Sequence, residues 1–390
     1  MTSSLGEPTP VLTYARARLY LGASAVGTLT VLATLALLLG LPERWWPSEP
    51  GAWTRDVLGW ALLVAVHAAL LAPFDLFAGS LIPRAYGRSA EPLAAFLARW
   101  ARGAVLHGLA LTTVGALVMA AARSAGGWGA VAAFVASSLA LLAGQPWVAA
   151  ALAGWRVRRL PATSATAALG AGALAYDAPQ PHVTGGAYGL PFRTRWVVPG
   201  RWASEPERVA LDAQAVRRAW IERSGARDRG VLLALAWNAV PLLVVLAVWG
   251  APTAPADLVR WALLATVGSF LGLLVLPTPS RRAVLDADAA ARASGVDAVR
   301  LTAALERLDL DQDDEPQRSA GVEAIFHPIP GLRRRTEALA SSDPATASGT
   351  SAWHAARVAL YTSWASVGFL GRAVHCNLGR PEVWVFLPSD

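Results

Sequence analysis

The sequence has a single cysteine and few charged residues for its length. Cys376, alone among 390 residues, excludes an internal disulfide framework and is typical of a reducing compartment. Only 16% of the residues are charged, whereas 54% are hydrophobic, a balance too apolar for an ordinary soluble protein of this length. The chain is therefore expected to be an integral membrane protein.

Long runs without a charged residue indicate where the chain crosses the membrane. About 20 residues of helix span the hydrocarbon, and a charge at its centre costs about 2.5–3.5 kcal/mol on insertion scales. The sequence therefore predicts six membrane helices. The charge-free runs are Leu19–Leu41, Val57–Phe74, Gly103–Ala122, Gly127–Ala150, Val231–Gly250 and Trp261–Leu276.

Arginines are concentrated in alternate loops between these runs. Short loops that carry the excess of basic residues lie on the cytoplasmic side of a membrane. Residues 14–18, 84–102 and 156–159 are rich in arginine, whereas residues 42–54, 123–126 and 251–256 carry at most one arginine each. We therefore expect a multi-pass protein of the cell (inner) membrane with both termini in the cytoplasm.

The formal net charge of +7 follows largely from these loops. Membrane lipids, and anionic headgroups in particular, are the expected partners of such a charge distribution. A nucleic-acid-binding protein would present a basic face interleaved with stacking aromatic side chains, which the sequence lacks. No nucleic-acid partner is therefore expected.

Short segments with distinct patterns surround the last pair of apolar runs. Residues 207–218 (ERVALDAQAVRR) predict a helix before the pair, and residues 280–288 (SRRAVLDAD) follow it. Residues 184–191 (TGGAYGLP) and 196–200 (WVVPG) favour strands, and Phe326-His-Pro328 precedes Arg333–Arg335. The order of these segments is more specific than any one of them.

This order resembles the membrane zinc metallopeptidases of the CAAX prenyl protease and HtpX type. The resemblance implies a mainly α-helical polytopic membrane protein with about six transmembrane helices and a split cytoplasmic zincin-like α+β domain. The resemblance covers about residues 180–340, after the first four charge-free runs. The expected parts are a four-helix bundle at 1–155, a first cytoplasmic half at 156–229, a membrane hairpin at 230–278, and a second cytoplasmic half at 279–390.

The second half is expected to end in a helix. Its apolar part, Val358–Gly371, is shorter than a bilayer is thick. We therefore expect this helix to dock on the cytoplasmic domain or to lie at the membrane interface.

The zinc ligands of the family are missing from this chain. In the family, H-E-x-x-H places two histidine ligands on one helix face, and the glutamate of E-x-x-x-D completes the site. Here Ala213 and Arg217 stand at the histidine positions, Gln214 at the general base and Val284 at the second glutamate, so that only Asp288 is retained. A methyl group has no lone pair for zinc, a guanidinium is permanently cationic, and an amide cannot take a proton from bound water. No metal, other cofactor or catalytic residue is therefore expected.

The resemblance then implies a pseudopeptidase whose retained property is binding. The groove of the family accepts an extended polypeptide along a strand edge. Arg217 could take the place of the metal cation and pair with Asp288, and the expected partner is a membrane-associated protein, peptide or lipid that the chain binds or scaffolds. The candidate binding residues are Tyr188, Gly189, Leu190, Trp196, Val197, Val198, Arg217, Asp288 and His327.

An active membrane metalloendopeptidase with a non-standard ligand set is the first alternative. His182 and His327 could converge with Asp288 near the vacated site. No two of the six histidines, however, have the spacing of a metal pair on one helix.

A channel or carrier is the second alternative. His67, Asp75 and His107 lie in or beside the predicted membrane helices. An ionisable group within a membrane is a functional candidate by default, although a hydrogen bond between helices also explains it.

Overall fold

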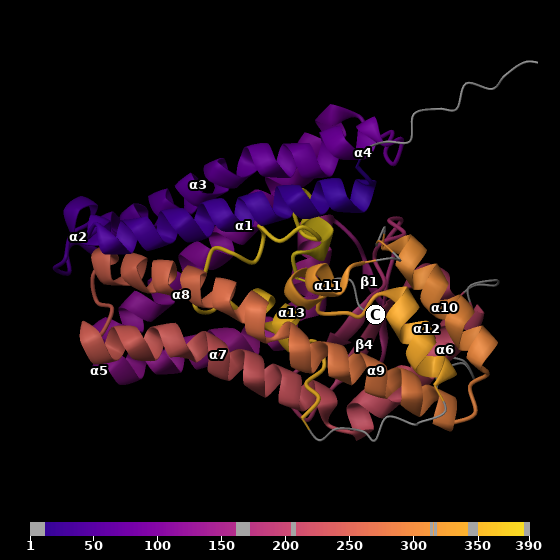
Figure 1. The fold of residues 1–390 in the computed structure, drawn as a ribbon. Helices are drawn as coiled ribbons and strands as arrows, with labels where there is room; N and C mark the ends of the chain where they lie inside the picture. Colours follow the sequence, from indigo (N-terminus) through magenta and orange to yellow (C-terminus); the bar gives the residue numbers. More distant parts are fainter. Residues whose placement is uncertain are drawn as a thin grey trace, which may run out of the picture.

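The structure of the protein, a computed structural model, describes residues 12–160, 172–203, 208–312, 315, 318–341 and 350–385. Within these residues, five helices are long and apolar enough to cross a membrane. They form a bundle, and further helices with a four-stranded sheet form a smaller domain at one end of it (Figure 1). The chain is therefore a multi-pass, mainly α-helical membrane protein.

The helices of the bundle are apolar on their outer as well as their inner faces. In α3 (Trp53–Leu76), Leu58, Leu62 and Val66 are exposed at intervals of four residues, while Trp60 and Val64 are buried. Such a pattern suits a helix with lipid on one side and protein on the other. The five helices are α1 (Tyr14–Leu38), α3 (Trp53–Leu76), α5 (Leu93–Ala153), α7 (Ala226–Val248) and α8 (Pro255–Val275), while α2 (Leu41–Trp45), the π-helical η1 (Phe77–Leu81) and α4 (Ile82–Ala85) are short.

Helix α5 contains two of the six predicted membrane runs. Its backbone leaves the helical conformation at Ala125 and Gly126, and the φ of +59° at Gly126 favours glycine. A Cβ atom added at Gly154 would overlap the guanidinium of Arg102, so the two ends of α5 lie next to each other. The helix therefore folds back on itself, and five helices carry the six predicted runs.

The smaller part, which we call the helix–sheet domain, surrounds a sheet in the order β1-β2-β4-β3. Strands β2 and β4 are parallel, and the other two pairs are antiparallel. Helix α9 begins directly after Leu276, which caps α8, so the last membrane helix leads straight into this domain. Its elements are β1 (Val157–Arg159), β2 (Leu174–Tyr176), β3 (Gly186–Tyr188), β4 (Arg195–Pro199), η3 (Gly200–Ala203), α6 (Arg208–Arg223), α9 (Pro277–Ala293), α10 (Ala298–Asp311), α11 (Ala320–Phe326) and α12 (Leu332–Ala340).

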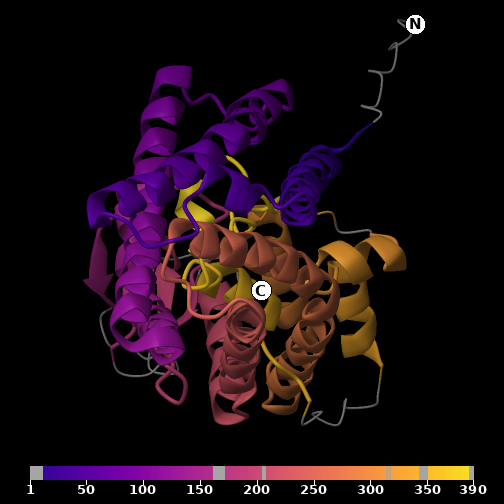
Figure 2. The same cartoon turned by 90° about the vertical axis from the view of Figure 1, so that its left-hand side faces the viewer.

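The C-terminal segment, residues 351–385, lies inside the membrane bundle. It begins with α13 (Ala355–Thr362), which packs on α7, continues without regular structure and ends in η4 (Pro381–Val383). The yellow segment is enclosed by the helices in both views (Figures 1 and 2). Phe369 stacks on Trp60 of α3 with ring centroids 6.0 Å apart, and the Gln145 side chain of α5 donates to the Val385 carbonyl.

The expectation of a helix docked on the cytoplasmic domain or at the interface is wrong for this segment. Only eight residues, Ala355–Thr362, are α-helical, and almost all of residues 351–385 are buried. Non-helical backbone is tolerated at membrane depth where protein surrounds it and satisfies its polar groups. The bundle supplies such surroundings, since Asn238 of α7 donates to the Ala359 carbonyl and to Thr362.

A buried ion pair fixes the C-terminal segment to the bundle. Asp75, at the end of α3, accepts a hydrogen bond of 2.6 Å from Arg372, and both side chains are fully buried. The same carboxylate also accepts from the indole of Trp100 at 2.9 Å and from the Gly379 backbone N–H at 2.7 Å. Asp75 therefore joins α3, α5 and the C-terminal segment, which is a structural role for this polar residue.

The two membrane histidines are packed among aromatic rings of the same segment. His67 stacks on Phe369 with centroids 4.6 Å apart and contacts its carbonyl oxygen at 3.0 Å. The His107 ring meets Trp364 edge-on at 4.5 Å. The channel or carrier alternative thus gains no support, because the C-terminal segment occupies the bundle interior beside both histidines.

The variant Asp75→Ala should lower the free energy of unfolding by about 3–5 kcal/mol, because it leaves the Arg372 guanidinium buried without its carboxylate. The unfolding midpoint of detergent-purified protein measures this loss. Asp177→Ala is the control, since the Asp177–Arg158 pair is about half exposed and its loss should cost less than about 1 kcal/mol. Equal losses in the two variants would contradict the anchoring role of Asp75.

Candidate functional site

Helices α6 and α9 bring together the positions that the family resemblance singled out. The two helices pack against each other across the hydrophobic core of the helix–sheet domain. Ala213, Gln214 and Arg217 of α6 are buried, as are Val284 and Asp288 of α9. Because residues three and four apart share a helix face, each helix presents these positions to the interior.

Four polar side chains form a buried cluster at this place, which we call the Asp288 cluster. Arg217 Nε donates to Asp288 Oδ1 at 2.6 Å, so the pair expected from the aligned positions is present. Arg335 of α12 donates to both oxygens of the same carboxylate, at 2.8 and 2.9 Å. Arg217 Nη1 also donates to Gln214 Oε1 at 2.8 Å. Gln214, Arg217, Asp288 and Arg335 therefore make one hydrogen-bonded unit.

The chemistry of the Asp288 cluster does not suit a metal ion. Guanidinium groups carry donors only and no lone pair, and here two of them share a single carboxylate. The side chain of Gln214 turns its oxygen toward Arg217, and its Nε2 has no hydrogen-bond partner among the described residues. The guanidinium groups of Arg217 and Arg335 therefore surround Asp288. A metal ion bound to Asp288 would need further side chains with electron pairs to donate, and the cluster has none beside the carboxylate except the Gln214 oxygen.

Arg335 is the member of the cluster that sequence reasoning missed. It was identified only as part of the Arg333–Arg335 run, without a partner. The sequence does contain a signal, since Leu332, Arg335 and Leu339 are spaced i, i+3, i+7 and therefore share the apolar face of α12. An arginine on the apolar face of a helix must find a buried acceptor.

Of the strand residues predicted as a peptide-binding edge, some lie in an inner strand of the sheet and others at or beside an edge strand. Strand β4, with Trp196, Val197 and Val198, is paired on one side with β2 and on the other with β3. The expectation that these three residues offer an edge is therefore wrong. Instead they form core, and the Trp196 ring lies 5.1 Å below the Arg218 guanidinium and 5.7 Å from Trp353.

Strand β3 forms one edge of the sheet, β1 forms the other, and α5 covers part of the β3 edge. Tyr188 is buried, and its ring meets Trp147 edge-on at 6.3 Å. The Gly189 N–H donates to the Leu142 carbonyl of α5. Arg227 Nη2 donates to the Gly189 carbonyl at 2.6 Å, and its Nη1 donates to that of Leu190 at 3.3 Å. These backbone groups are thus already engaged within the chain.

His182 and His327, proposed for a non-standard metal site, have partners outside the Asp288 cluster. His182 Nε2 is 3.1 Å from Glu382 in the C-terminal segment, and burial lowers the pKa of its imidazole. Glu382 also accepts a hydrogen bond of 2.6 Å from Arg99 of α5, so its carboxylate is held by both side chains. His327 packs against His375, and its carbonyl accepts from Arg281 at 2.9 Å, which anchors the loop before α12.

Across the described residues, no group of three or more His, Cys, Asp or Glu side chains is arranged to hold a metal ion. The set of His182, His327 and Asp288 is not such a group, because each of the three has a different partner. The active-peptidase alternative therefore finds no ligand set in the described part of the chain.

A membrane bundle is joined to a helix–sheet domain, which the α7–α8 pair divides in the sequence. Among solved structures, this chain is similar to Ste24p of S. mikatae, with a TM-score of 0.59 over 72% of this chain and 74% of that chain. The sequence identity is 13%, so the likeness establishes the fold alone. No protein-family model and no curated protein sequence matches the chain.

The variant Asp288→Asn should lower the free energy of unfolding by about 3–5 kcal/mol, because two buried guanidinium groups lose their shared negative charge. Chemical unfolding of the purified protein measures the change. Glu337→Gln is a matched control on α12, since Glu337 and Arg333 are exposed partners 3.6 Å apart and should contribute less than about 1 kcal/mol. A stable Asp288→Asn protein would show that the cluster does not hold the domain together.

Proposed function

We propose that this chain is a catalytically inactive counterpart of the membrane zinc metallopeptidases, a pseudopeptidase that binds or scaffolds a membrane-associated protein, peptide or lipid. The observation that carries the proposal is the Arg217–Asp288 pair at 2.6 Å. It joins two motif positions that the family uses around its metal, and it puts an arginine where a zinc ligand would be.

Each chemical role of the family motif is lost at its own position. Ala213 and Val284 offer hydrocarbon where zinc needs electron pairs, and both are buried. Gln214 cannot accept the proton of a metal-bound water at neutral pH. Arg217 repels a second cation, so it disfavours zinc beyond the mere loss of a ligand. In this proposal, the guanidinium of Arg217 replaces the metal as the cation that Asp288 binds.

Binding is the function that such a chain can retain. The likeness to Ste24p supports a retained fold, and the buried Ala213 and Val284 side chains support the loss of the metal ligands. Partner recognition by pockets and backbone groups requires no metal. We further propose, from the arginine-rich loops, that the chain lies in the cell (inner) membrane with both termini in the cytoplasm.

Elemental analysis of the detergent-purified protein for zinc, manganese, iron and cobalt tests the loss of the metal. We expect no metal at a significant fraction of one ion per chain, because the Asp288 cluster already contains its cation. Near-stoichiometric metal that disappears in Asp288→Ala would overturn the proposal.

Restoring the ligands tests whether these positions correspond to a metal site. The variant carries Ala213→His, Gln214→Glu, Arg217→His and Val284→Glu, and it should bind about one zinc ion per chain, since it recreates three ligands and removes the repelling charge. The matched control omits Ala213→His and should bind zinc more weakly. A folded fourfold variant without zinc would mean that α6 and α9 do not present these positions to a common point.

A further inference from the structure

Helix α11 has its charged and apolar side chains in the reverse of the usual arrangement. Its one charged residue, Glu323, is only 6% exposed, and its carboxylate accepts hydrogen bonds from the Gly331 N–H at 2.8 Å and from Arg334 at 2.7 Å. By contrast, Ile325 is 47% exposed and Phe326 is 37% exposed. A surface helix in water buries its apolar side chains and exposes its charged ones. The outer face of α11 is therefore suited to surroundings other than water.

The apolar face of α11 adjoins the outer surface of a membrane helix. Helix α11 packs against α8 and α9 where one leads into the other. Leu271, Leu274 and Val275 in the last turns of α8 are exposed, and on a membrane helix such side chains face lipid. Leu274 and Ile325 line the same cavity, so they lie near each other. The lipid-facing surface of α8 thus extends onto α11.

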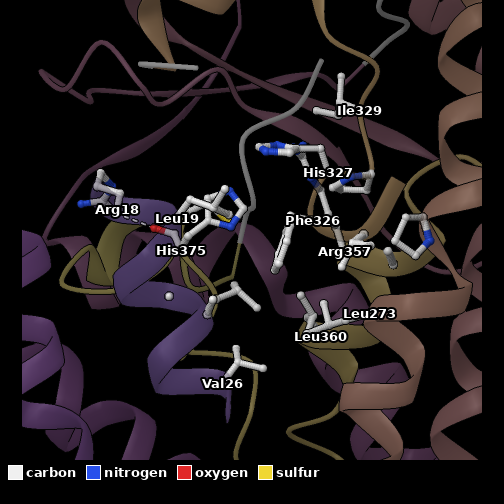
Figure 3. A pocket seen from close by; sticks show the side chains of 18 of the residues that line it. Arg18, Leu19, Val26, Leu273, Phe326, His327, Ile329, Arg357, Leu360 and His375 are labelled. Atoms are coloured by element: carbon white, nitrogen blue, oxygen red, sulfur yellow. Dashed lines mark hydrogen bonds between the residues drawn. The ribbon is translucent and has the colours of Figure 1, made fainter. Parts of the chain in front are cut away.

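The inner side of α11 meets the apolar interior of the bundle. A cavity of about 380 Å³ separates α1 from the C-terminal segment, and Phe326 lies in its wall with Leu273 of α8 and Leu360 of α13 (Figure 3). Both Leu273 and Leu360 belong to the bundle rather than to the helix–sheet domain. Helix α11 is therefore the part of the helix–sheet domain that lies beside the hydrocarbon of the bundle.

The backbone at the C-terminal end of α11 finds hydrogen-bond donors within the protein. Carbonyl groups at a helix end lack partners in the helix itself and in water bind solvent. Here the buried side chain of Arg281 donates to the carbonyl oxygens of Glu323, Ala324 and His327, at 3.2, 3.1 and 2.9 Å. Hydrocarbon offers no water to such groups, so they must be satisfied internally. This end of α11 meets that requirement at three carbonyls.

We propose that α11 is immersed in the bilayer leaflet nearest the helix–sheet domain, with Ile325 in contact with lipid acyl chains. Lipid is the partner because the exposed face of α11 adjoins the lipid-facing residues of α8. Removing these apolar side chains from water stabilises the immersion. The helix–sheet domain is then held against the membrane by its own surface as well as by its chain connections. This inference goes beyond the proposed function and does not depend on the loss of the metal.

Site-directed spin labelling of the full chain in phosphatidylcholine nanodiscs tests the immersion. Cys376→Ser removes the one native thiol, and Ile325→Cys then carries the label. Electron paramagnetic resonance measures how often the label collides with oxygen, which concentrates in hydrocarbon, and with a polar nickel chelate, which hydrocarbon excludes. The ratio of the two collision rates reports whether lipid or water surrounds the label.

Matched controls define the two extremes of this ratio. Val299→Cys is the water control, because Val299 is an apolar residue of α10 that is 76% exposed, and α10 packs on α6 and α12 away from the bundle (Figure 1). Leu62→Cys, at an exposed residue of membrane helix α3, is the lipid control. We expect the ratio of oxygen to nickel collisions at Ile325→Cys to exceed that at Val299→Cys at least about tenfold, because the polar chelate does not enter hydrocarbon.

A second label on the same face of α11 keeps the test informative if Ile325→Cys does not fold. Gly321 lies one turn before Ile325, and a Cβ atom added there would meet no atom within 4 Å. Gly321→Cys should therefore fold, and its collision ratio should also exceed that of Val299→Cys. Unfolding midpoints show whether each labelled variant has kept its structure.

Two results would overturn the proposal. Labels on α11 that collide with the nickel chelate as often as the label at Val299→Cys would place the helix in water. Labels that collide with neither reagent would mean that protein covers α11, either another segment of the chain or a second copy. A metal found by elemental analysis would overturn the pseudopeptidase without bearing on α11, because the labels report only the surroundings of this helix.

Discussion

Buried ion pairs between arginine and aspartate hold the two halves of this protein in place. In the bundle, Arg372 binds Asp75, and in the helix–sheet domain, Arg217 and Arg335 bind Asp288. Every one of the 34 basic residues is an arginine, whose planar fork of donors suits a carboxylate away from water better than the point charge of a lysine does. Such pairs contribute little net stability compared with hydrocarbon, but they penalise any arrangement that separates their members. They therefore select one packing of the helices.

The Asp288 cluster also cross-links three helices of the helix–sheet domain. Here Asp288 of α9 binds a guanidinium from α6 and another from α12. The cations at the centre are part of the chain, so this cross-link between helices requires no ion from solution. Under the proposed function, donors of hydrogen bonds stand where a peptidase needs electron-pair donors.

The sequence predicted what depends on local composition and on the order of motifs. Charge-free runs located the membrane helices, and the aligned motif positions predicted that Arg217 and Asp288 would meet. It could not predict the contacts of Arg372, because a partner 297 residues away in the chain leaves no local pattern. Val358–Gly371 is too short for a helix that spans the bilayer, so the sequence predicted a position outside the membrane. That length requirement applies to helices that face lipid, whereas this segment is surrounded by protein. Trp196–Val198 appeared to be an edge because pairing on both sides requires β2, which lies some 20 residues earlier. The alternation of apolar and polar residues along a strand does not predict which strands pair with it.

The burial of residues 351–385 has a consequence for how the protein is made. All five apolar helices leave the ribosome before this segment does, and domains and helices form in the order of their synthesis. During that interval the helices stand in the membrane with Asp75, His67 and His107 facing an unfilled interior. The nascent bundle therefore has to hold these polar side chains in water or against temporary partners until residues 351–385 arrive. Membrane insertion and completion of the fold are thus two separate events in the life of this chain.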